Sequence, residues 1–567
     1  MQYARIIAAV LVFAIATLNG CVSPGHDTIT EITKLQRRIL DQGPQDRQLD
    51  GLGLMTPKSN LPKLVTSVNP KTKRVQIKLS LSEALARALA NNTDIAISSY
   101  APELSRQEII SAAAAFDFNL NAGWNFQSRR SSGRRNSSSN PTFGLAKRFV
   151  YGTSAELTTR FNRNYESGRN NSERFTGDVA LRITQPLLRG FGLDANLFTF
   201  RLSSINYQTS KSQFRATVLD ILRRVMGNYY VVIRTKREVE IASRLLSRTQ
   251  AIYELIVKRR EGGFKGATVI EVNQILAAVK ARQAALLSAQ KNYQDAQERL
   301  AVLLADTEIN VLKNPEIIPT TKLCDTKINF SVADQLKAAL KYSPRLEQAR
   351  LTIKSSDLRV RYTKNMLLPR LDANITLGTS GDNRKRQTMW NEILKTSNNQ
   401  YNIGLMFSYP LGNRAAESRY ASARLQRQRN LVQIQQTADS IALSIKELVR
   451  RIELSYNTLQ LQRTVFKAAN KQLEGMTALY GINEKGTIEK DSVGGITPLS
   501  VNIFLQTQAS IAQAEIAMIV AEQQYNSAII ELQALTGELI KAQNIDVAKS
   551  FAEPLPDKSI DSIKPSK

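Results

Sequence analysis

Residues 116–127 read FDFNLNAGWNFQ, and the alternation in this stretch decides the fold class. Apolar side chains occupy every even position, and Asp, Asn, Gly and Gln occupy every odd one. Because successive side chains of a β-strand point to opposite faces, the stretch predicts a strand with one apolar and one polar face. The same alternation recurs within 175–183, 371–378 and 401–409.

The alternating segments are few, and each lies between long helical stretches. A soluble β-sandwich would also alternate, but it would place many strands next to one another. Strands of about ten residues with one apolar and one polar face are what the wall of a membrane β-barrel requires. The segments 128–142, 166–174 and 379–399 are rich in Ser, Asn, Gly and Arg, and we expect them to be solvent-facing loops.

No stretch after residue 20 has the 18 or more uninterrupted apolar residues expected of a spanning helix. Only helices and closed barrels satisfy their backbone polar groups in lipid. A chain of this kind that crosses a bilayer must therefore cross it as strands.

Long helices account for most of the remaining chain. Residues 196–260 contain no proline, and apolar side chains recur three or four positions apart there and again from Ile441 to Leu459. At 1.5 Å per residue, about 65 residues of helix reach roughly 100 Å. A coiled coil without a channel would show the same spacing, so the helices alone leave that alternative open.

The two halves of the chain match each other. Gln185-Pro186-Leu187 corresponds to Tyr409-Pro410-Leu411 at an offset of 224 residues. Gly262-Gly263 and Tyr293 correspond to Gly494-Gly495 and Tyr525 at an offset of 232. Each half therefore runs helix, strands, proline, long helix, glycine turn and helix, which indicates a tandem structural repeat.

Composition argues against several other classes of protein. The 567 residues include one His and two Cys, which excludes Cys/His zinc sites, a His-based triad and a disulfide scaffold. We expect no cofactor, no metal site and no catalytic residue. The net charge of +28 is spread along the chain without an aromatic-basic motif, so we expect no nucleic-acid partner.

The first residues of the chain have the pattern of a targeting signal. Arg5 precedes an apolar run of signal-peptide length, and the run ends in Leu18-Asn19-Gly20-Cys21, which resembles the bacterial lipobox. Cleavage before Cys21 would leave a lipid-carrying thiol that anchors the chain to membrane. Val22 follows where an Asp would favour the inner membrane, so the resemblance implies the outer membrane. A plain secretory signal with an incidental Cys is the alternative.

The order of elements from about residue 79 to 540 resembles the TolC-like outer membrane efflux proteins. The residues that carry the resemblance are LSLSEALARALANN at 79–92, TQPLLRG at 184–190 and LPRL at 368–371. The resemblance implies a mainly α protein with a membrane β-barrel, whose long coiled-coil hairpins form an α-barrel. It also implies a homotrimer that works with a periplasmic adaptor (membrane fusion) protein and an inner-membrane pump.

We expect the following organisation: a signal peptide at 1–20, a lipid-anchored tether at 21–75, a first repeat at 76–310, a linker at 311–328, a second repeat at 329–540 and a disordered tail at 541–567. Pro186, Pro369 and Pro410 mark the junctions between strands and helices, since proline neither donates to a ladder nor continues a helix. The glycine pairs mark turns where positive φ is expected. The resemblance places these turns at the periplasmic tip, and the adaptor-contact candidates are Arg259, Arg260, Gly262, Gly263, Gly481, Asp491, Gly494 and Gly495.

Two features depart from the family pattern. The second tip is about eight residues longer, near 481–493. The first strand region is also longer, with 68 residues from Phe118 to Pro186 against 41 from Pro369 to Pro410. The extra length carries an alternating pair of segments joined through Gly152. It either extends the barrel from four strands per chain to six or forms a separate extracellular hairpin, and we favour the hairpin.

The sequence thus predicts an outer-membrane channel of a tripartite efflux or type I secretion system, driven by its inner-membrane pump. Such a conduit is passive, anchored by lipid in the outer membrane and extended into the periplasm. The alternative is a lipid-anchored periplasmic coiled-coil protein without a pore.

Overall fold

A computed structural model describes most of the chain between residues 65 and 542. The described ranges are 65–68, 74–131, 134–167, 172–262, 268–306, 308–309, 315–396, 398–480 and 498–542. All of them belong to one unit, Ser59–Gln543. The predicted signal peptide, the predicted tether up to residue 64 and the predicted tail from residue 543 onward lie outside the described residues.

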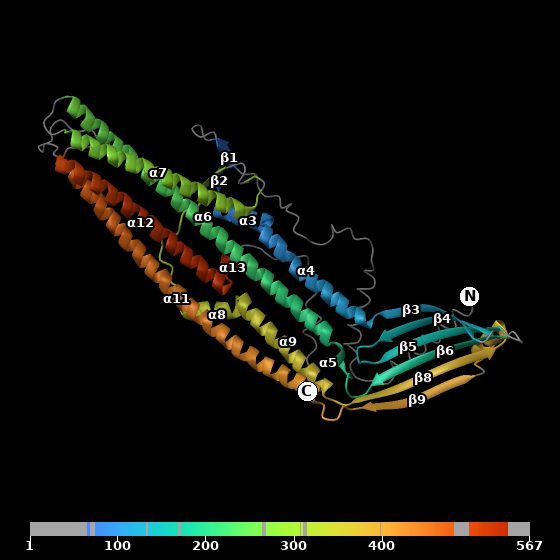
Figure 1. The fold of residues 1–567 in the computed structure, drawn as a ribbon. Coiled ribbons are helices and arrows are strands. Elements are labelled where there is room, and N and C mark those ends of the chain that lie inside the picture. Colours follow the sequence, from blue (N-terminus) through green and yellow to red (C-terminus); the bar gives the residue numbers. More distant parts are fainter. Residues whose placement is uncertain are drawn as a thin grey trace. The chain divides into compact units, whose positions relative to one another are not determined.

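Two long helical hairpins dominate this unit (Figure 1). In the first, α6 (Phe198–Glu261) packs against α7 (Val269–Leu304), and in the second, α11 (Arg414–Tyr480) packs against α12 (Pro498–Thr536). α6 has 64 residues and α11 has 67, and neither contains a proline that would break it. α12 also packs against α6, which joins the two hairpins.

Apolar side chains at three-four spacing form the contacts between these helices, as predicted. In the second repeat, Ile441, Ile445, Leu448 and Ile452 of α11 are buried against Tyr525 of α12. In the first repeat, the buried side chains of α6 include Val218, Leu222, Val225, Tyr229, Val232, Ile241, Ile252 and Ile256. Burial of these stripes, rather than helix propensity, stabilises helices of this length in water.

A pair of shorter helices opens each repeat. α3 (Leu81–Asn91) and α4 (Thr93–Ala113) pack on α6, and α8 (Val332–Tyr342) and α9 (Pro344–Met366) pack on α11. Ser80 and Glu83 form a capping box at the start of α3, and Asn92 separates α3 from α4 while its side chain caps α4. In the second repeat, Pro344 begins α9 at a position where its missing N–H costs nothing.

Six strands form one antiparallel sheet, which follows the short helix pairs along the chain and precedes the long helices (Figure 1). The strand order is β3-β4-β5-β6-β8-β9. The strands are β3 (Phe118–Ser131), β4 (Arg134–Arg148), β5 (Ser154–Ser167), β6 (Ser172–Pro186), β8 (Arg370–Asn383) and β9 (Asn399–Ser408). A 3₁₀ turn, η2 (Ala114–Phe116), leads from α4 into β3.

The extra length of the first strand region lies within this sheet, and the expectation of a separate hairpin is wrong. β4 pairs with β3 along almost its whole length, and β5 pairs with β6 in the same way. Residues 134–142, expected in a loop, are part of β4. An isolated hairpin is marginally stable and leaves the backbone groups of both outer edges unpaired, whereas β3 and β6 satisfy them here.

The expected loop at 379–399 is also partly regular. β8 extends to Asn383, and α10 (Arg386–Leu394) follows it. Met389 and Ile393, one helical turn apart, are buried against the sheet. α10 lies over Phe161, Gly177 and Gly381. The two glycines leave room that a larger side chain would fill, since a Cβ on Gly381 would lie 2.3 Å from the carbonyl oxygen of Met389.

A small sheet and two short helices complete the unit. β2 (Val75–Leu79) pairs antiparallel with β1 (Val65–Val68) and parallel with β7 (Glu316–Pro319). β1 lies in the segment expected as tether, and β7 in the segment expected as linker. The remaining helices are α5 (Leu193–Asn196) and α13 (Leu539–Ala542).

Among the described residues, one helical stretch, Asn502–Thr536, is long and apolar enough to cross a membrane by length and composition. It lies within α12, which packs against α11 and α6 through buried residues that include Ile519, Tyr525 and Leu532. Its apolar composition is therefore accounted for by contacts inside the unit.

Candidate functional site

The two faces of the six-stranded sheet differ in chemistry across its full width. One row of paired positions, traced from β3 to β9, is Leu120, Leu145, Leu157, Leu181, Leu377 and Tyr401. The adjacent row, which points to the opposite face, is Asn121, Gly144, Thr158, Ala180, Gly378 and Gln400. The alternation predicted for single strands is therefore in register in all six.

Charged groups on the polar face require water. Arg160 Nη2 lies 3.2 Å from a carboxylate oxygen of Asp178, and both side chains remain substantially exposed. Arg174 forms a second ion pair on this face with Asp382. A charge is strongly unfavourable in hydrocarbon, so this face is suited to an aqueous space and not to lipid.

Polar side chains on the apolar face are confined mainly to its two ends. At the helix-proximal end, Lys147 Nζ lies 4.1 Å from the centre of the Phe118 ring. At the loop end, Arg163 pairs with Glu173. On β5, eight residues separate Ala155, the partner of Lys147, from Arg163, or roughly 26 Å along the strand. The apolar band of an outer-membrane barrel is about 25 Å tall.

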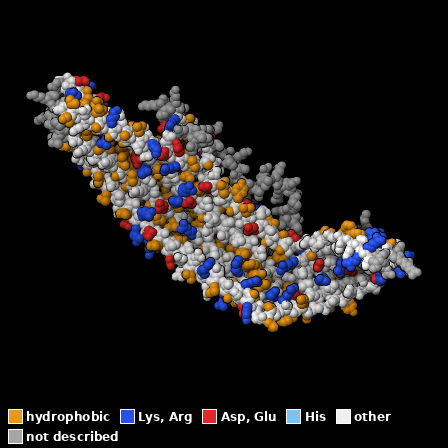
Figure 2. All heavy atoms as spheres, viewed as in Figure 1, with side chains coloured by type: hydrophobic (Ala, Val, Ile, Leu, Met, Phe, Trp, Pro, Cys, Tyr) orange, Lys and Arg blue, Asp and Glu red, His pale blue; other side chains and the backbone are white. Residues whose placement is uncertain are grey.

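Basic side chains gather toward the loop end of the sheet, far from the long helices (Figure 2). Arg129, Arg130 and Arg135 lie near the paired ends of β3 and β4, and Arg163 and Arg174 lie near the paired ends of β5 and β6. A surface of this kind attracts anionic lipid headgroups.

The structure places the three junction prolines as follows. Pro186 is the last residue of β6, and beyond it the Leu187 amide donates to the Leu371 carbonyl at 2.7 Å. The Arg189 amide donates to the Pro369 carbonyl at 3.1 Å, which brings the first and second junctions together. The Pro410 carbonyl accepts from the amide of Asn413 at 3.1 Å.

Three asparagines that the sequence analysis did not identify hold these junctions. Asn365 Oδ1 accepts the Gly190 amide at 2.8 Å, and Asn196 Nδ2 donates to the Gly190 carbonyl at 2.8 Å. Asn413 Nδ2 donates to the Leu367 carbonyl at 3.0 Å. Backbone groups at a junction have neither ladder nor helix partners, and these side chains supply them. Only Asn413 had a signal, because it follows the turn sequence Pro-Leu-Gly.

The turn between β4 and β5 docks on the same junction. Gly152 has φ 98°, and a Cβ there would lie 2.6 Å from the Gly190 carbonyl oxygen and 2.8 Å from Asn196 Nδ2. Arg148, at the end of β4, donates to Asn196 Oδ1 at 2.7 Å. The extra hairpin of β4 and β5 is therefore fixed in two ways. Its strands pair with β3 and β6, and its turn contacts the junction.

The first helical tip is described in part. Arg259 and Arg260 lie in the last turn of α6. Gly262 has φ −78°, so the expectation of positive φ is wrong at this residue. Its amide donates to the Lys258 carbonyl at 3.0 Å, an ordinary helical bond that needs no left-handed residue. The tip candidates Gly263, Gly481, Asp491, Gly494 and Gly495 lie outside the described residues.

The described ends of the two hairpins meet in one apolar cluster. Ile256 of α6 and Ile275 of α7 are buried with Phe504 of α12, and Leu473 of α11 packs against them. Thr268 and Glu271 form a capping box that begins α7 at the tip, and the sequence signal for it is the T-x-x-E pattern at 268–271. The two tips therefore lie at the same end of the unit.

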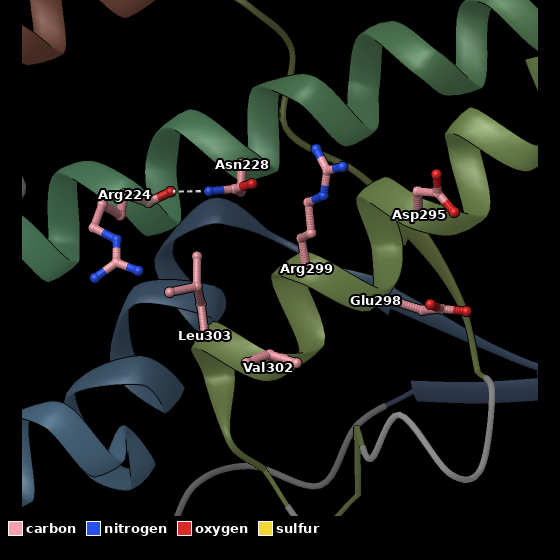
Figure 3. Close-up of a pocket in the computed structure, with 7 residues that line it drawn as sticks. All are labelled: Arg224, Asn228, Asp295, Glu298, Arg299, Val302 and Leu303. Atoms are coloured by element: carbon pink, nitrogen blue, oxygen red, sulfur yellow. Dashed lines mark hydrogen bonds between the residues drawn. The ribbon is translucent and has the colours of Figure 1, made fainter.

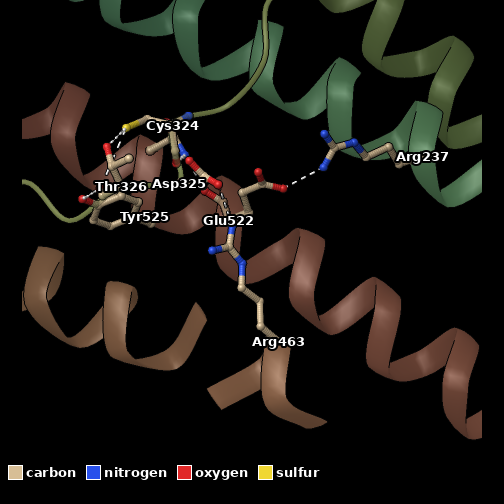
Figure 4. Close-up of polar contacts among 8 residues, drawn as sticks. Arg237, Cys324, Asp325, Thr326, Arg463, Glu522 and Tyr525 are labelled. Carbon is tan, nitrogen blue, oxygen red and sulfur yellow. Dashed lines mark hydrogen bonds and ion pairs between the residues drawn. The ribbon is translucent and has the colours of Figure 1, made fainter. Parts of the chain in front are cut away.

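The segment that connects the repeats contacts both hairpins. The Thr321 amide donates to Tyr229 Oη of α6 at 3.2 Å, and the contacts with α11 and α12 lie close by (Figure 4). Asn526 of α12 exchanges two hydrogen bonds with the backbone of Cys324, at 3.0 and 2.9 Å. Asp325 pairs with Arg463 of α11 at 3.4 Å. Nearby, Arg237 of α6 pairs with Glu522 of α12 at 2.7 Å. The Arg237–Glu522 pair couples the two hairpins directly.

A surface hollow of about 580 Å³ lies between α6 and α7 (Figure 3). Its lining residues are Arg224, Asn228, Asp295, Glu298, Arg299, Val302 and Leu303. Mixed charges and an exposed valine are typical of a solvated helix surface. Within the described part of the chain, no group of three or more His, Cys, Asp or Glu side chains is placed to hold a metal ion.

Comparison with known proteins identifies the fold. No protein-family model matches the sequence, and no curated protein matches it. A membrane protein from Pseudomonas aeruginosa superposes with a TM-score of 0.58 at 16% identity, covering 81% of this chain and 93% of that one. The CmeC outer membrane channel of Campylobacter jejuni gives 0.58 at 14% identity, covering 83% and 90%.

The open state of the MtrE outer membrane channel of Neisseria gonorrhoeae gives a TM-score of 0.56 at 15% identity, covering 81% of this chain and 89% of that one. The chain thus has the fold of outer-membrane channels over most of its length. The TolC-like architecture expected from the sequence is confirmed.

Proposed function

We propose that this chain is the outer-membrane channel of a tripartite efflux or type I secretion system. Three copies would form a passive conduit across the outer membrane and the periplasm, driven by an inner-membrane pump. The observation that carries the proposal is the six-stranded sheet whose leucine row faces one way and whose Asn, Thr and charged groups face the other. A wall between lipid and water requires this arrangement.

A matched pair of substitutions on β9 tests the proposal. Ile403 is 77% exposed on the apolar face, and Asn402, its neighbour, is exposed on the polar face. If the sheet is a membrane wall, Ile403→Lys places a charge in lipid, which costs about 2–4 kcal/mol at the midplane. We expect it to abolish insertion into outer membranes. Asn402→Lys should insert normally and shift the conductance in planar bilayers toward anions.

The alternative, a periplasmic coiled-coil protein without a pore, makes a different prediction. Both side chains would then be exposed to water, and neither substitution would change the location of the protein. Purified wild-type protein would also give no conductance. That combination of results would reject the channel.

The proposed anchor is a lipid on Cys21 after removal of residues 1–20, with Val22 directing the protein to the outer membrane. Acyl chains contribute roughly 0.8 kcal/mol per buried methylene, so a multiply acylated chain stays bound. We expect labelled palmitate to be incorporated by the wild type and not by Cys21→Ser. Incorporation by the variant would contradict the anchor.

The helical tips are the proposed contact with the periplasmic adaptor, and Arg259 and Arg260 are its described candidates. A photo-crosslinking residue at position 260 should capture the adaptor in cells. The control is the same residue at Lys291, which is 74% exposed on α7 far from the tip. Capture from position 291 but not from position 260 would place the adaptor elsewhere.

A further inference from the structure

The six-stranded sheet has two open edges. Its order begins with β3 and ends with β9, and these two strands do not pair with each other in the described structure. Each edge therefore presents a row of backbone N–H and C=O groups without ladder partners. Within hydrocarbon such groups are strongly unfavourable, so a sheet that forms a membrane wall must close.

We propose that β3 of one copy pairs with β9 of the next, so that three copies close a single barrel of eighteen strands. The inference rests on the proposed function for the membrane setting and for the number of copies. It differs from the expectation of four strands per copy, which would give twelve, because β4 and β5 lie inside the ladder and not beside it.

The directions of the strands allow this junction. Every neighbouring pair in the sheet is antiparallel. Because each copy contributes an even number of strands, β3 and β9 run in opposite directions. The junction between copies is then antiparallel too, and the ladder has the same geometry around the whole ring.

The two edges also match in the chemistry of their faces. Leu120 and Trp124 of β3 are 75% and 72% exposed, and Tyr401 and Ile403 of β9 are 78% and 77% exposed. All four lie on the apolar face. Joining β3 to β9 makes the apolar band continuous around the barrel and keeps Asn121 and Asn125 of β3 and Asn402 of β9 on the inside.

The stagger of the strands is that of a barrel. The row of paired residues that starts at Phe118, the first residue of β3, reaches β9 at Ile403. β9 ends five residues later, at Ser408. We place Phe118 and Ser408, the helix-proximal ends of β3 and β9, at the same height along the barrel axis. The ladder then shifts by five residues across five strand spacings, which corresponds to a strand tilt of roughly 35°. Closed barrels need a tilt of 35–45°.

The same shift predicts the register of the junction between copies. The ladder shifts by about one residue per strand, so one more strand spacing places Ser408 opposite Asn119 of the next copy, and therefore Asn402 opposite Asn125. Both pairs lie on the polar face. Barrel diameter grows roughly linearly with strand number, and barrels of 16–18 strands enclose an aqueous channel.

Cysteine crosslinking tests the junction in the full chain. In a Cys324→Ser background, Asn125→Cys and Asn402→Cys are combined, and the protein is oxidised in outer membranes. We expect covalent dimers and trimers on denaturing gels and no larger species. Moving the first cysteine by two positions, with Gly123→Cys or Gln127→Cys, covers a register that differs by one pair. Single-cysteine variants are the controls.

A second pair tests the position of the extra hairpin. Asn121 and Ala180 lie on one row, separated by β4 and β5, so their backbones are three strand spacings, or roughly 14 Å, apart. We expect no crosslink between Asn121→Cys and Ala180→Cys. If β4 and β5 were outside the ring, β3 would lie beside β6 and this pair would form a crosslink within one chain.

The outcomes separate the inference from the proposed function. Covalent products that continue beyond three copies would show an open assembly and overturn the closed barrel. Absence of links between β3 and β9 at all three registers, in protein that still conducts in planar bilayers, would overturn the junction and leave the channel intact. Absence of both links and conductance would overturn the proposed function itself.

Discussion

The first and second repeats share a helical scheme and differ in their share of the sheet. Each opens with a short helix pair and ends with a long hairpin, but the first supplies β3 to β6 and the second only β8 and β9. The helical frame is therefore compatible with four or two strands between the same junctions. The comparison shows that strand number is set by the segment between junctions, not by the repeat that carries it.

The ends of the hairpins show a second difference. The residue after α7 is Ala305, at φ 48°, and the residue after α12 is Gly537, at φ 80°, 232 positions later. Both repeats require a left-handed residue here, since each amide returns to a carbonyl of the preceding turn. Only the second repeat uses the residue that adopts this conformation without strain.

Matching tyrosines hold the chain between the repeats. Tyr293 donates to the Ile317 carbonyl at 2.8 Å, and Tyr525 donates to the Thr326 carbonyl at 2.8 Å. The Tyr525 hydroxyl also accepts from the Ile328 amide at 3.0 Å. The repeated position thus has the same role twice, with one more hydrogen bond in the second repeat.

The largest expected effect concerns a buried ion pair of the first repeat. Arg87 of α3 and Asp306, next to the end of α7, are 4% and 5% exposed and pair with each other. Asp306→Ala removes the nearer carboxylate from a buried guanidinium and leaves it with half-exposed Glu308, 3.4 Å away, so we expect a loss of about 3 kcal/mol in denaturant titration, the low end of the range for a broken buried pair. The matched control is Glu531→Ala, which removes the exposed pair with Arg451 at 2.9 Å. It should cost less than about 1 kcal/mol. Equal losses of stability in the two variants would contradict the expectation that the buried pair contributes more than the exposed pair.

The next effect has opposite signs in the two repeats. Gly537→Ala forces a non-glycine residue to φ 80° and places its Cβ 2.4 Å from the Tyr342 carbonyl oxygen. We expect it to cost about 1–3 kcal/mol. Ala305→Gly relieves the strain at the equivalent position and should raise the unfolding temperature slightly, because the relief exceeds the entropy of the added glycine. A fall in unfolding temperature for Ala305→Gly would refute the equivalence.

Removing the hydroxyl group of Tyr293 or of Tyr525 should show the contribution of the additional hydrogen bond in the second repeat. Tyr293→Phe loses one bond to a carbonyl and should cost about 1 kcal/mol. Tyr525→Phe leaves both the Thr326 carbonyl and the Ile328 amide without this partner, and it should cost about 2 kcal/mol. Unfolding free energies of the two variants, measured side by side, give the difference. A larger loss for Tyr293→Phe would be the contrary result.

The smallest effect is a pH dependence at alkaline pH. Burial raises the pKa values of Tyr293 and Tyr525, and it raises the pKa of Tyr230 to about 12. The unfolded chain releases these protons first, near pH 10, so stability is complete below that pH and declines as the pH rises toward the folded pKa. At pH 10.5 the loss is less than about 1 kcal/mol per tyrosine. Tyr230→Phe should flatten the decline between pH 10 and 12, and an unchanged slope would speak against it.

The junctions between strands and helices show which residues a local sequence pattern can predict and which it cannot. Pro186, Pro369 and Pro410 were predictable because proline restricts its own backbone whatever surrounds it. Asn365 was not, because its role depends on Gly190, which the fold brings from 175 positions away. Asn196 lies six residues from Gly190, but its bond to the Gly190 carbonyl depends on how the chain turns at the junction. α10 was missed for a similar reason, since its two buried residues form a stripe only once Gly177 and Gly381 lie beneath it.

The sequence by itself determined the long helices, the alternating core of the barrel-type strands, which face of those strands is apolar and that the chain is a tandem repeat. These properties follow from side-chain periodicity and from the intrinsic limits of proline and glycine, which act within a few residues. Only the tertiary structure decided that β4 and β5 enter the sheet, that Arg87 meets Asp306 and that the two tips share one cluster. An alternating strand has the same pattern wherever its ladder partner lies, so the partner is selected by pairing between distant segments.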